Sequence, residues 1–157
     1  MSEGCPLRAV LVDLGYTLAR WDVPDALLRT SYREAHAALA VARPDQAPPD
    51  DLLLRVTQHV GAALRASHER GDLAEQDHYA LFAEALAHHG YALAPGAVRQ
   101  IADLEHAAFV RHLRVPDATL QALAALRARG LRLGLVSNVS APGTLMRRTL
   151  ATLGLAP

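Results

Sequence analysis

Two short apolar runs, each closed by polar residues, lie far apart along the chain. The first covers residues 8–13 (RAVLVD) and the second covers residues 131–137 (LRLGLVS). Short runs that are rich in Val and Leu are typical of parallel strands whose two faces are both covered. The pattern therefore predicts two buried parallel strands, one near each end of the sequence.

The residues between and after these runs have helical spacing. Leu28, Tyr32, Ala35 and Leu39 are four, three and four residues apart, so they share one face of a helix. The other predicted helices are bounded by prolines or acidic residues at their starts and by glycines at several of their ends. The predicted helices begin near Pro24 and then span 49–71, 74–89, 95–113, 117–129 and 142–153.

This order of elements predicts an α/β architecture. A strand, a set of helices, a second strand and a last helix follow one another, which is typical of a parallel core interrupted by a helical insert. We expect the core to comprise residues 1–19 and 115–157, and the insert to comprise residues 20–114.

The composition narrows the class of protein. The sequence is 51% hydrophobic and 20% charged, which is typical of a globular chain. Its net charge is zero, so it has no electrostatic footprint for nucleic acid or an anionic membrane. No apolar stretch approaches the roughly 20 residues that cross a bilayer, and the single cysteine, Cys5, cannot form an internal disulfide. We therefore expect a cytoplasmic protein without a nucleic-acid or membrane partner.

The candidate chemistry lies where the two predicted strands end. Asp13 closes the first run, and Ser137 and Asn138 follow the second. Ligands of open α/β sheets bind at the carboxyl ends of the strands. A carboxylate there can attack a phosphoryl group and form an aspartyl-phosphate, and Mg²⁺ is the expected helper because two anions must approach each other. The Ser137 hydroxyl and the Asn138 amide can donate hydrogen bonds to the phosphoryl oxygens.

These motifs resemble those of the haloacid dehalogenase superfamily. Its members have a strand that ends in Asp-x-x-x-Thr-Leu, and the motif here reads DLGYTL from Asp13, followed by a helical insert and a strand that ends in Ser-Asn. The insert is similar to the helical cap that one group of the superfamily carries after the first motif. The resemblance implies a Rossmann-type parallel core, represented by its first two strands. It also implies a Mg²⁺-dependent, phosphatase-like hydrolase that acts on a small phosphorylated molecule.

The resemblance implies a role for each residue of the two motifs. Asp13 would be the nucleophile and a Mg²⁺ ligand, and the backbone carbonyl of Gly15 would be a second Mg²⁺ ligand. Thr17 would support the motif loop and the phosphoryl site. Ser137 and Asn138 would hold the phosphoryl group.

Two features depart from that family. Gly15 stands where its phosphatases usually carry a second aspartate as general acid and base, although its dehalogenases, phosphonatases and ion-pumping ATPases also lack this residue. The glycine argues against an efficient phosphomonoesterase and leaves substrates with good leaving groups, such as acyl phosphates. The sequence contains no lysine and ends at Pro157, before the third and fourth motifs could occur. We therefore expect a truncated chain that lacks a C-terminal segment or associates with itself.

Two other functions fit the same residues. One is a non-catalytic remnant of the haloacid dehalogenase fold that acts as a binding or assembly module. The other is a hydrolase of carbon–halide bonds, in which Asp13 attacks carbon. Tyr16 and Trp21 adjoin the first motif and either line a substrate pocket or pack against the insert. The eight histidines are scattered, without a His-Glu-x-x-His pattern, and do not predict a metal site.

Overall fold

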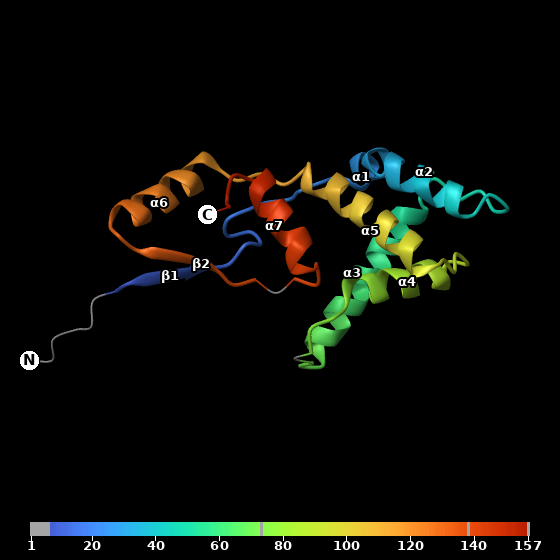
Figure 1. Cartoon of the computed structure of the whole chain (residues 1–157), viewed down its shortest axis with the longest axis horizontal. Coiled ribbons are helices and arrows are strands. Elements are labelled where there is room, and N and C mark those ends of the chain that lie inside the picture. Colours follow the sequence, from blue (N-terminus) through green and yellow to red (C-terminus); the bar gives the residue numbers. More distant parts are fainter. Residues whose placement is uncertain (1–6, 73, 138, 157) are drawn as a thin grey trace, which may run out of the picture. The chain divides into compact units, whose positions relative to one another are not determined.

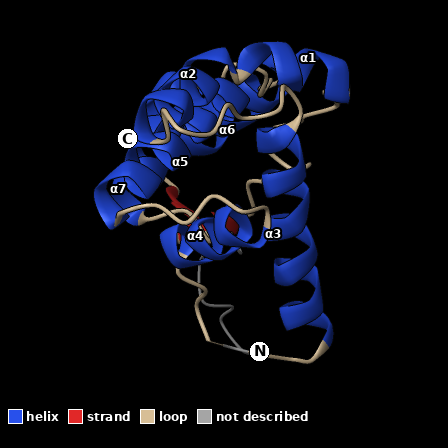
Figure 2. Cartoon of the chain, turned by 90° about the vertical axis from the view of Figure 1, so that its right-hand side faces the viewer, coloured by secondary structure: helices blue, strands red, loops and turns tan. Residues whose placement is uncertain are grey.

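A computed structural model describes residues 7–72, 74–137 and 139–156, so Cys5 and Asn138 lie outside the described residues. The described part is mixed α/β, with a two-stranded parallel sheet and seven helices (Figure 2). The strands are β1 (Ala9–Val12) and β2 (Arg132–Leu135). The helices are α1 (Asp25–Ser31), α2 (Arg33–Ala42), α3 (Leu52–Glu69), α4 (His78–His88), α5 (Pro95–Val110), α6 (Asp117–Ala128) and α7 (Gly143–Thr152).

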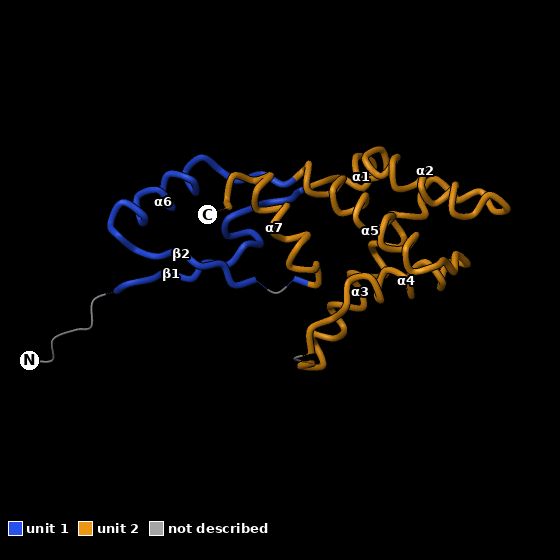
Figure 3. The backbone as a smooth tube through the Cα atoms, in the orientation of Figure 1, with its two compact units in different colours: residues 1–22, 113–139 blue, residues 23–112, 140–157 orange. Residues whose placement is uncertain are grey.

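The chain forms two compact units (Figure 3). The strand unit consists of Met1–Asp22 and Leu113–Val139, and the helical unit consists of Val23–His112 and Ser140–Pro157. The last segment, which contains α7, is grouped with the helices, whereas the sequence places it in the core. The division into a core and a cap that covers residues 20–114 therefore stays a prediction.

The sheet of the strand unit is parallel, as the sequence predicts. Val12 is paired with Leu135, and the Val136 N–H donates to the Val12 carbonyl at 3.0 Å, so pairing continues to the end of β1. Helix α6 immediately precedes β2 and packs against it (Figure 1). The pairing brings the carboxyl ends of β1 and β2 to the same edge of the sheet.

Two further segments of the strand unit lie side by side. Arg20 leaves the first motif and Arg114 returns toward α6, and their backbones exchange two hydrogen bonds of 2.9 Å. This is an isolated antiparallel bridge. The point where the chain leaves for α1 and the point where it comes back from α5 are therefore held together.

One face of the sheet carries exposed apolar side chains. Leu11 is 70% exposed and Val136 is 59% exposed. Leu11 lies over Gly134, because a Cβ atom at position 134 would be 2.6 Å from the Leu11 Cδ2 atom. The two strands are not covered on both faces within the described residues, in contrast to the expectation of fully buried strands.

The main apolar core belongs to the helical unit. Helix α2 packs against α5, and α3 packs against α4. Each large side chain buried here contributes about 1.5–3 kcal/mol through removal of apolar surface from water. The core comprises Tyr32, Ala35, Leu39, Leu52, Leu53, Val56, Val60, Phe82, Ala85, Leu86, Tyr91, Val98, Ile101, Ala102 and Ala108.

The predicted helices are confirmed, with two differences. The helix that begins near Pro24 is divided at Tyr32 into α1 and α2. The hydroxyls of Thr30 and Ser31 donate to carbonyls one turn earlier, at 3.1 and 2.8 Å, and such bonds bend helices. Helix α4 begins at His78 and not near residue 74, because the Asp77 carboxylate accepts the N–H groups of residues 79 and 80.

Candidate functional site

The loop that follows β1 presents its polar side chains to solvent. Leu14, Leu18 and Ala19 are buried and anchor the loop, whereas Asp13 and Thr17 are exposed. The turn is closed by backbone hydrogen bonds from residues 18 and 19 to the Leu14 carbonyl, at 3.0 and 2.9 Å. The alternation of apolar and polar residues in DLGYTLA thus keeps the Asp13 carboxylate accessible at the end of the strand.

The two sequence motifs lie at the same edge of the sheet. Asp13 follows β1 directly, and Ser137 follows the paired end of β2 after Val136. Within the first motif, the Thr17 hydroxyl donates a long hydrogen bond of 3.4 Å to the Asp13 carboxylate. Asn138 lies outside the described residues, so the structure places Asp13, Thr17 and Ser137 of the predicted phosphoryl site.

The surroundings of Gly15 were not foreseen from the sequence. A Cβ atom at position 15 would lie 2.8 Å from the Trp21 Cη2 atom, so the indole occupies the space of a side chain there. Tyr16 has a left-handed φ of 56° and is 59% exposed. Its ring centroid lies 4.6 Å from that of Trp21, with the two planes tilted by 46°. We call these two side chains the aromatic pair.

The loop offers oxygen donors that suit Mg²⁺. Asp13 is exposed, and the backbone carbonyl of Gly15 belongs to the same loop. Mg²⁺ prefers oxygen ligands and keeps several waters, so one carboxylate and one carbonyl are a chemically fitting partial set. No group of three or more His, Cys, Asp or Glu residues in the described part is arranged to hold a metal ion.

The helical unit contains buried and half-buried ionisable groups that the sequence analysis missed. Glu105 is buried, and desolvation raises the pKa of its carboxyl to about 7 although the Tyr32 hydroxyl bonds to it. His106 lies 2.9 Å from the Thr149 hydroxyl, and desolvation lowers the pKa of its imidazole to about 4. Desolvation also lowers the pKa of His78, whose two ring nitrogens have no partner within the described residues.

One serine–histidine pair in this unit has the distance of a nucleophile and its base. The Ser31 Oγ atom lies 2.6 Å from the His112 Nε2 atom. However, the hydroxyl hydrogen of Ser31 is directed to the Leu27 carbonyl at 2.8 Å, so the imidazole is the donor in this pair. The arrangement ties the end of α1 to the segment after α5 and does not activate the serine.

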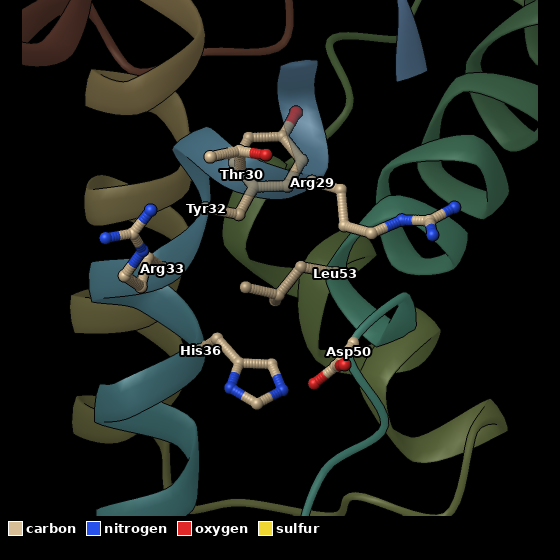
Figure 4. A pocket seen from close by; sticks show the side chains of 7 residues that line it. All are labelled: Arg29, Thr30, Tyr32, Arg33, His36, Asp50 and Leu53. Atoms are coloured by element: carbon tan, nitrogen blue, oxygen red, sulfur yellow. The ribbon is translucent and has the colours of Figure 1, made fainter. Parts of the chain in front are cut away.

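A cavity of about 240 Å³ is present on the helical unit (Figure 4). Its lining residues are Arg29, Thr30, Tyr32, Arg33, His36, Asp50 and Leu53. The His36 Nε2 atom lies 3.1 and 3.2 Å from the carbonyls of Pro48 and Pro49, which fixes the ring. Two arginines and one carboxylate make the lining basic, which favours anionic groups. The cavity lies in the helical unit, and Asp13 lies in the strand unit.

Comparison with known proteins does not assign a family. No family model matches the sequence, and no curated protein matches it. The fold is similar to the crystal structure of a predicted phosphoglycolate phosphatase from Haemophilus somnus 129PT, with a TM-score of 0.42 and 14% identity. The match covers 95% of this chain and 58% of that chain, so this chain spans 58% of its length. At this score and identity the likeness carries no argument about fold family or function.

Within the described part of the chain, none of the helices combines the length and apolar character that crossing a bilayer requires.

Proposed function

We propose that this chain contains the nucleophile of a phosphatase-like hydrolase of the haloacid dehalogenase kind. The main support is the parallel pairing of β1 with β2, because Asp13 and Ser137 follow the neighbouring ends of these two strands. The exposure of the Asp13 carboxylate and the hydrogen bond from Thr17 support this role. In this proposal residues 1–19 and 115–157 belong to the core and residues 20–114 form the cap.

The proposed reaction is transfer of a phosphoryl group to Asp13 and then to water. The Asp13 carboxylate attacks phosphorus, which splits one difficult hydrolysis into two easier steps. The Thr17 hydroxyl orients that carboxylate, and Ser137 with Asn138 donates hydrogen bonds to the phosphoryl oxygens. Mg²⁺ bound by Asp13 and the Gly15 carbonyl would reduce the repulsion between the two anions.

The test is covalent labelling of the full chain. Acetyl phosphate in the presence of Mg²⁺ is expected to add one acid-stable, hydroxylamine-sensitive phosphoryl group, measured by intact-mass spectrometry. Asp13→Asn should abolish this labelling, because an amide oxygen is a far weaker nucleophile than a carboxylate. Asp22→Asn is the matched control, since Asp22 is an exposed aspartate of the same unit. Equal labelling of the wild type and Asp13→Asn, or none of either, would contradict the proposal.

A second candidate reaction is supported by Gly15. Hydrolysis of a carbon–halide bond needs no acid, because the halide leaves without a proton, and position 15 provides none. In that reaction Asp13 would attack carbon. Release of halide from a 2-haloacid without Mg²⁺, abolished by Asp13→Asn, would favour this candidate over phosphoryl transfer. A non-catalytic binding module would show neither reaction.

A further inference from the structure

The aromatic pair gives the segment that follows Asp13 a specific chemical character. Tyr16 lies three residues after Asp13, and its ring contacts that of Trp21 at 4.6 Å between centroids. Tyr16 is nevertheless 59% exposed, so much of its ring faces solvent. Exposed aromatic faces and edges bind planar groups through stacked and edge-to-face contacts.

The backbone at Tyr16 is strained for a residue of this type. Its φ of 56° lies in the left-handed region, which is uncommon for residues other than Gly, Asn and Asp. Such conformations cost on the order of 1 kcal/mol and persist where the surrounding structure requires them, often at ligand sites. Here the turn is held by the Tyr16 N–H, which donates to the Ala19 carbonyl at 2.8 Å. The turn thus contains a tyrosine in a left-handed conformation whose ring is largely exposed.

The same loop cannot provide a carboxylic acid to protonate a leaving group. Residues 14–19 (LGYTLA) contain no Asp or Glu, and the Trp21 indole fills the space that a side chain at Gly15 would need. Without an acid from this loop, the site favours a leaving group that can depart as an anion, which requires a weakly basic oxygen. A phenolic oxygen meets this condition, because its pKa of about 10 is far below that of an ordinary alcohol.

We infer that the aromatic pair is a binding subsite for the leaving group, and that the substrates are phosphate monoesters of aromatic alcohols. This inference rests on the proposed function of Asp13. The Asp13 carboxylate forms an O–P bond while the P–O bond to the aryl oxygen breaks, and the aryl group leaves as an aryloxide anion. Water then cleaves the aspartyl-phosphate, which restores the carboxylate and releases dihydrogen phosphate.

The binding part of the inference is tested with ligands that cannot be hydrolysed. Trp21 is the only tryptophan in the chain, so its fluorescence reports directly on the aromatic pair. Phenylphosphonate should bind about three- to tenfold more tightly than methylphosphonate, the range expected for one aromatic contact, and should change the Trp21 emission. Tyr16→Asn, which suits a left-handed φ, should remove this preference, and Tyr16→Phe should keep it.

The reaction part is tested with a series of phosphate monoesters on the full chain with Mg²⁺. We expect kcat/KM to fall steeply as the leaving group becomes more basic, and aryl phosphates to be preferred over alkyl phosphates in a manner that depends on Tyr16. Equal binding of the two phosphonates would overturn the inference, and so would a preference that persists in a folded Tyr16→Asn variant. Neither result would affect the proposed function as long as labelling still depended on Asp13. Loss of Asp13-dependent labelling itself would instead overturn the proposed function, and the reaction class with it.

Discussion

At the scale of single residues, Gly15 affects both the chemistry of the loop and the packing of its aromatic side chains. Its missing side chain lets the Trp21 ring approach the backbone, and that ring in turn contacts Tyr16. The identity of residue 15 therefore determines both the absence of an acid in the loop and the position of the aromatic pair. Sequence reasoning detected the first effect, because it follows from residue type alone. The second depends on how the chain folds back after Ala19, which no local pattern specifies.

Gly15→Ala is expected to destabilise the protein by about 1–3 kcal/mol, because a Cβ atom 2.8 Å from the Trp21 ring forces that ring to move. The Trp21 emission should shift in the same variant. Both effects are measured by urea denaturation and fluorescence. Gly96→Ala is the matched control, because beyond the neighbouring residues and the backbone of its own helix no atom lies within 4 Å of the added methyl group. The stability of this variant should equal that of the wild type or exceed it by up to about 1 kcal/mol. Similar behaviour of the two variants would contradict the contact.

At the scale of the elements, the spacing of apolar residues predicted the helices, and the short apolar runs predicted the two parallel strands. The spacing did not reveal the bend at Tyr32, because that bend comes from hydroxyl groups of Thr30 and Ser31 that bond to their own helix. It also started α4 too early, although the capping residue Asp77 is visible in the sequence. The strands were expected to be covered on both faces, and the exposure of Leu11 shows that composition alone does not reveal what covers a strand.

The exposed face of the sheet leads to a prediction about association. Leu11→Gln should reduce self-association of the chain, because it removes an exposed apolar side chain from a short two-stranded sheet. Sedimentation velocity over a range of concentrations measures this effect, and circular dichroism checks the fold. Leu27→Gln on α1, where the leucine is 46% exposed, is the control and should have little influence. A monomeric wild type at all concentrations would contradict the prediction.

At the scale of the whole molecule, stability depends on two groups on α5, the buried Glu105 and the half-buried His106, that respond to pH in opposite ways. Glu105 keeps its proton in the folded state up to a pKa of about 7, compared with 4.5 in the unfolded chain, so stability falls as pH rises between these values. His106 stays neutral in the folded state down to a pKa of about 4, compared with 6.5, so stability falls as pH decreases through that window. The two effects oppose each other between about pH 4.5 and 6.5.

We predict that the free energy of unfolding depends weakly on pH in the wild type and steeply in each of two variants, Glu105→Gln and His106→Gln. Glu105→Gln should leave a protein that loses stability on acidification below pH 6.5, with His78 adding to the loss. His106→Gln should leave one that loses stability as pH rises from 4.5 to 7. Each change is on the order of 3 kcal/mol at most. Urea denaturation followed by circular dichroism across this range measures them, and parallel profiles for all three proteins would refute the assignment.

The bridge between Arg20 and Arg114 affects which changes of sequence length the protein can tolerate. Two backbone hydrogen bonds of 2.9 Å hold together the two ends of the segment between these residues, in the antiparallel geometry of a hairpin. The ninety-odd residues between them could therefore be exchanged as a cassette, or replaced by a tight turn, without altering the spacing of β1 and β2. We expect the protein to tolerate a longer, shorter or exchanged segment between Arg20 and Arg114 far better than a single residue inserted within either strand.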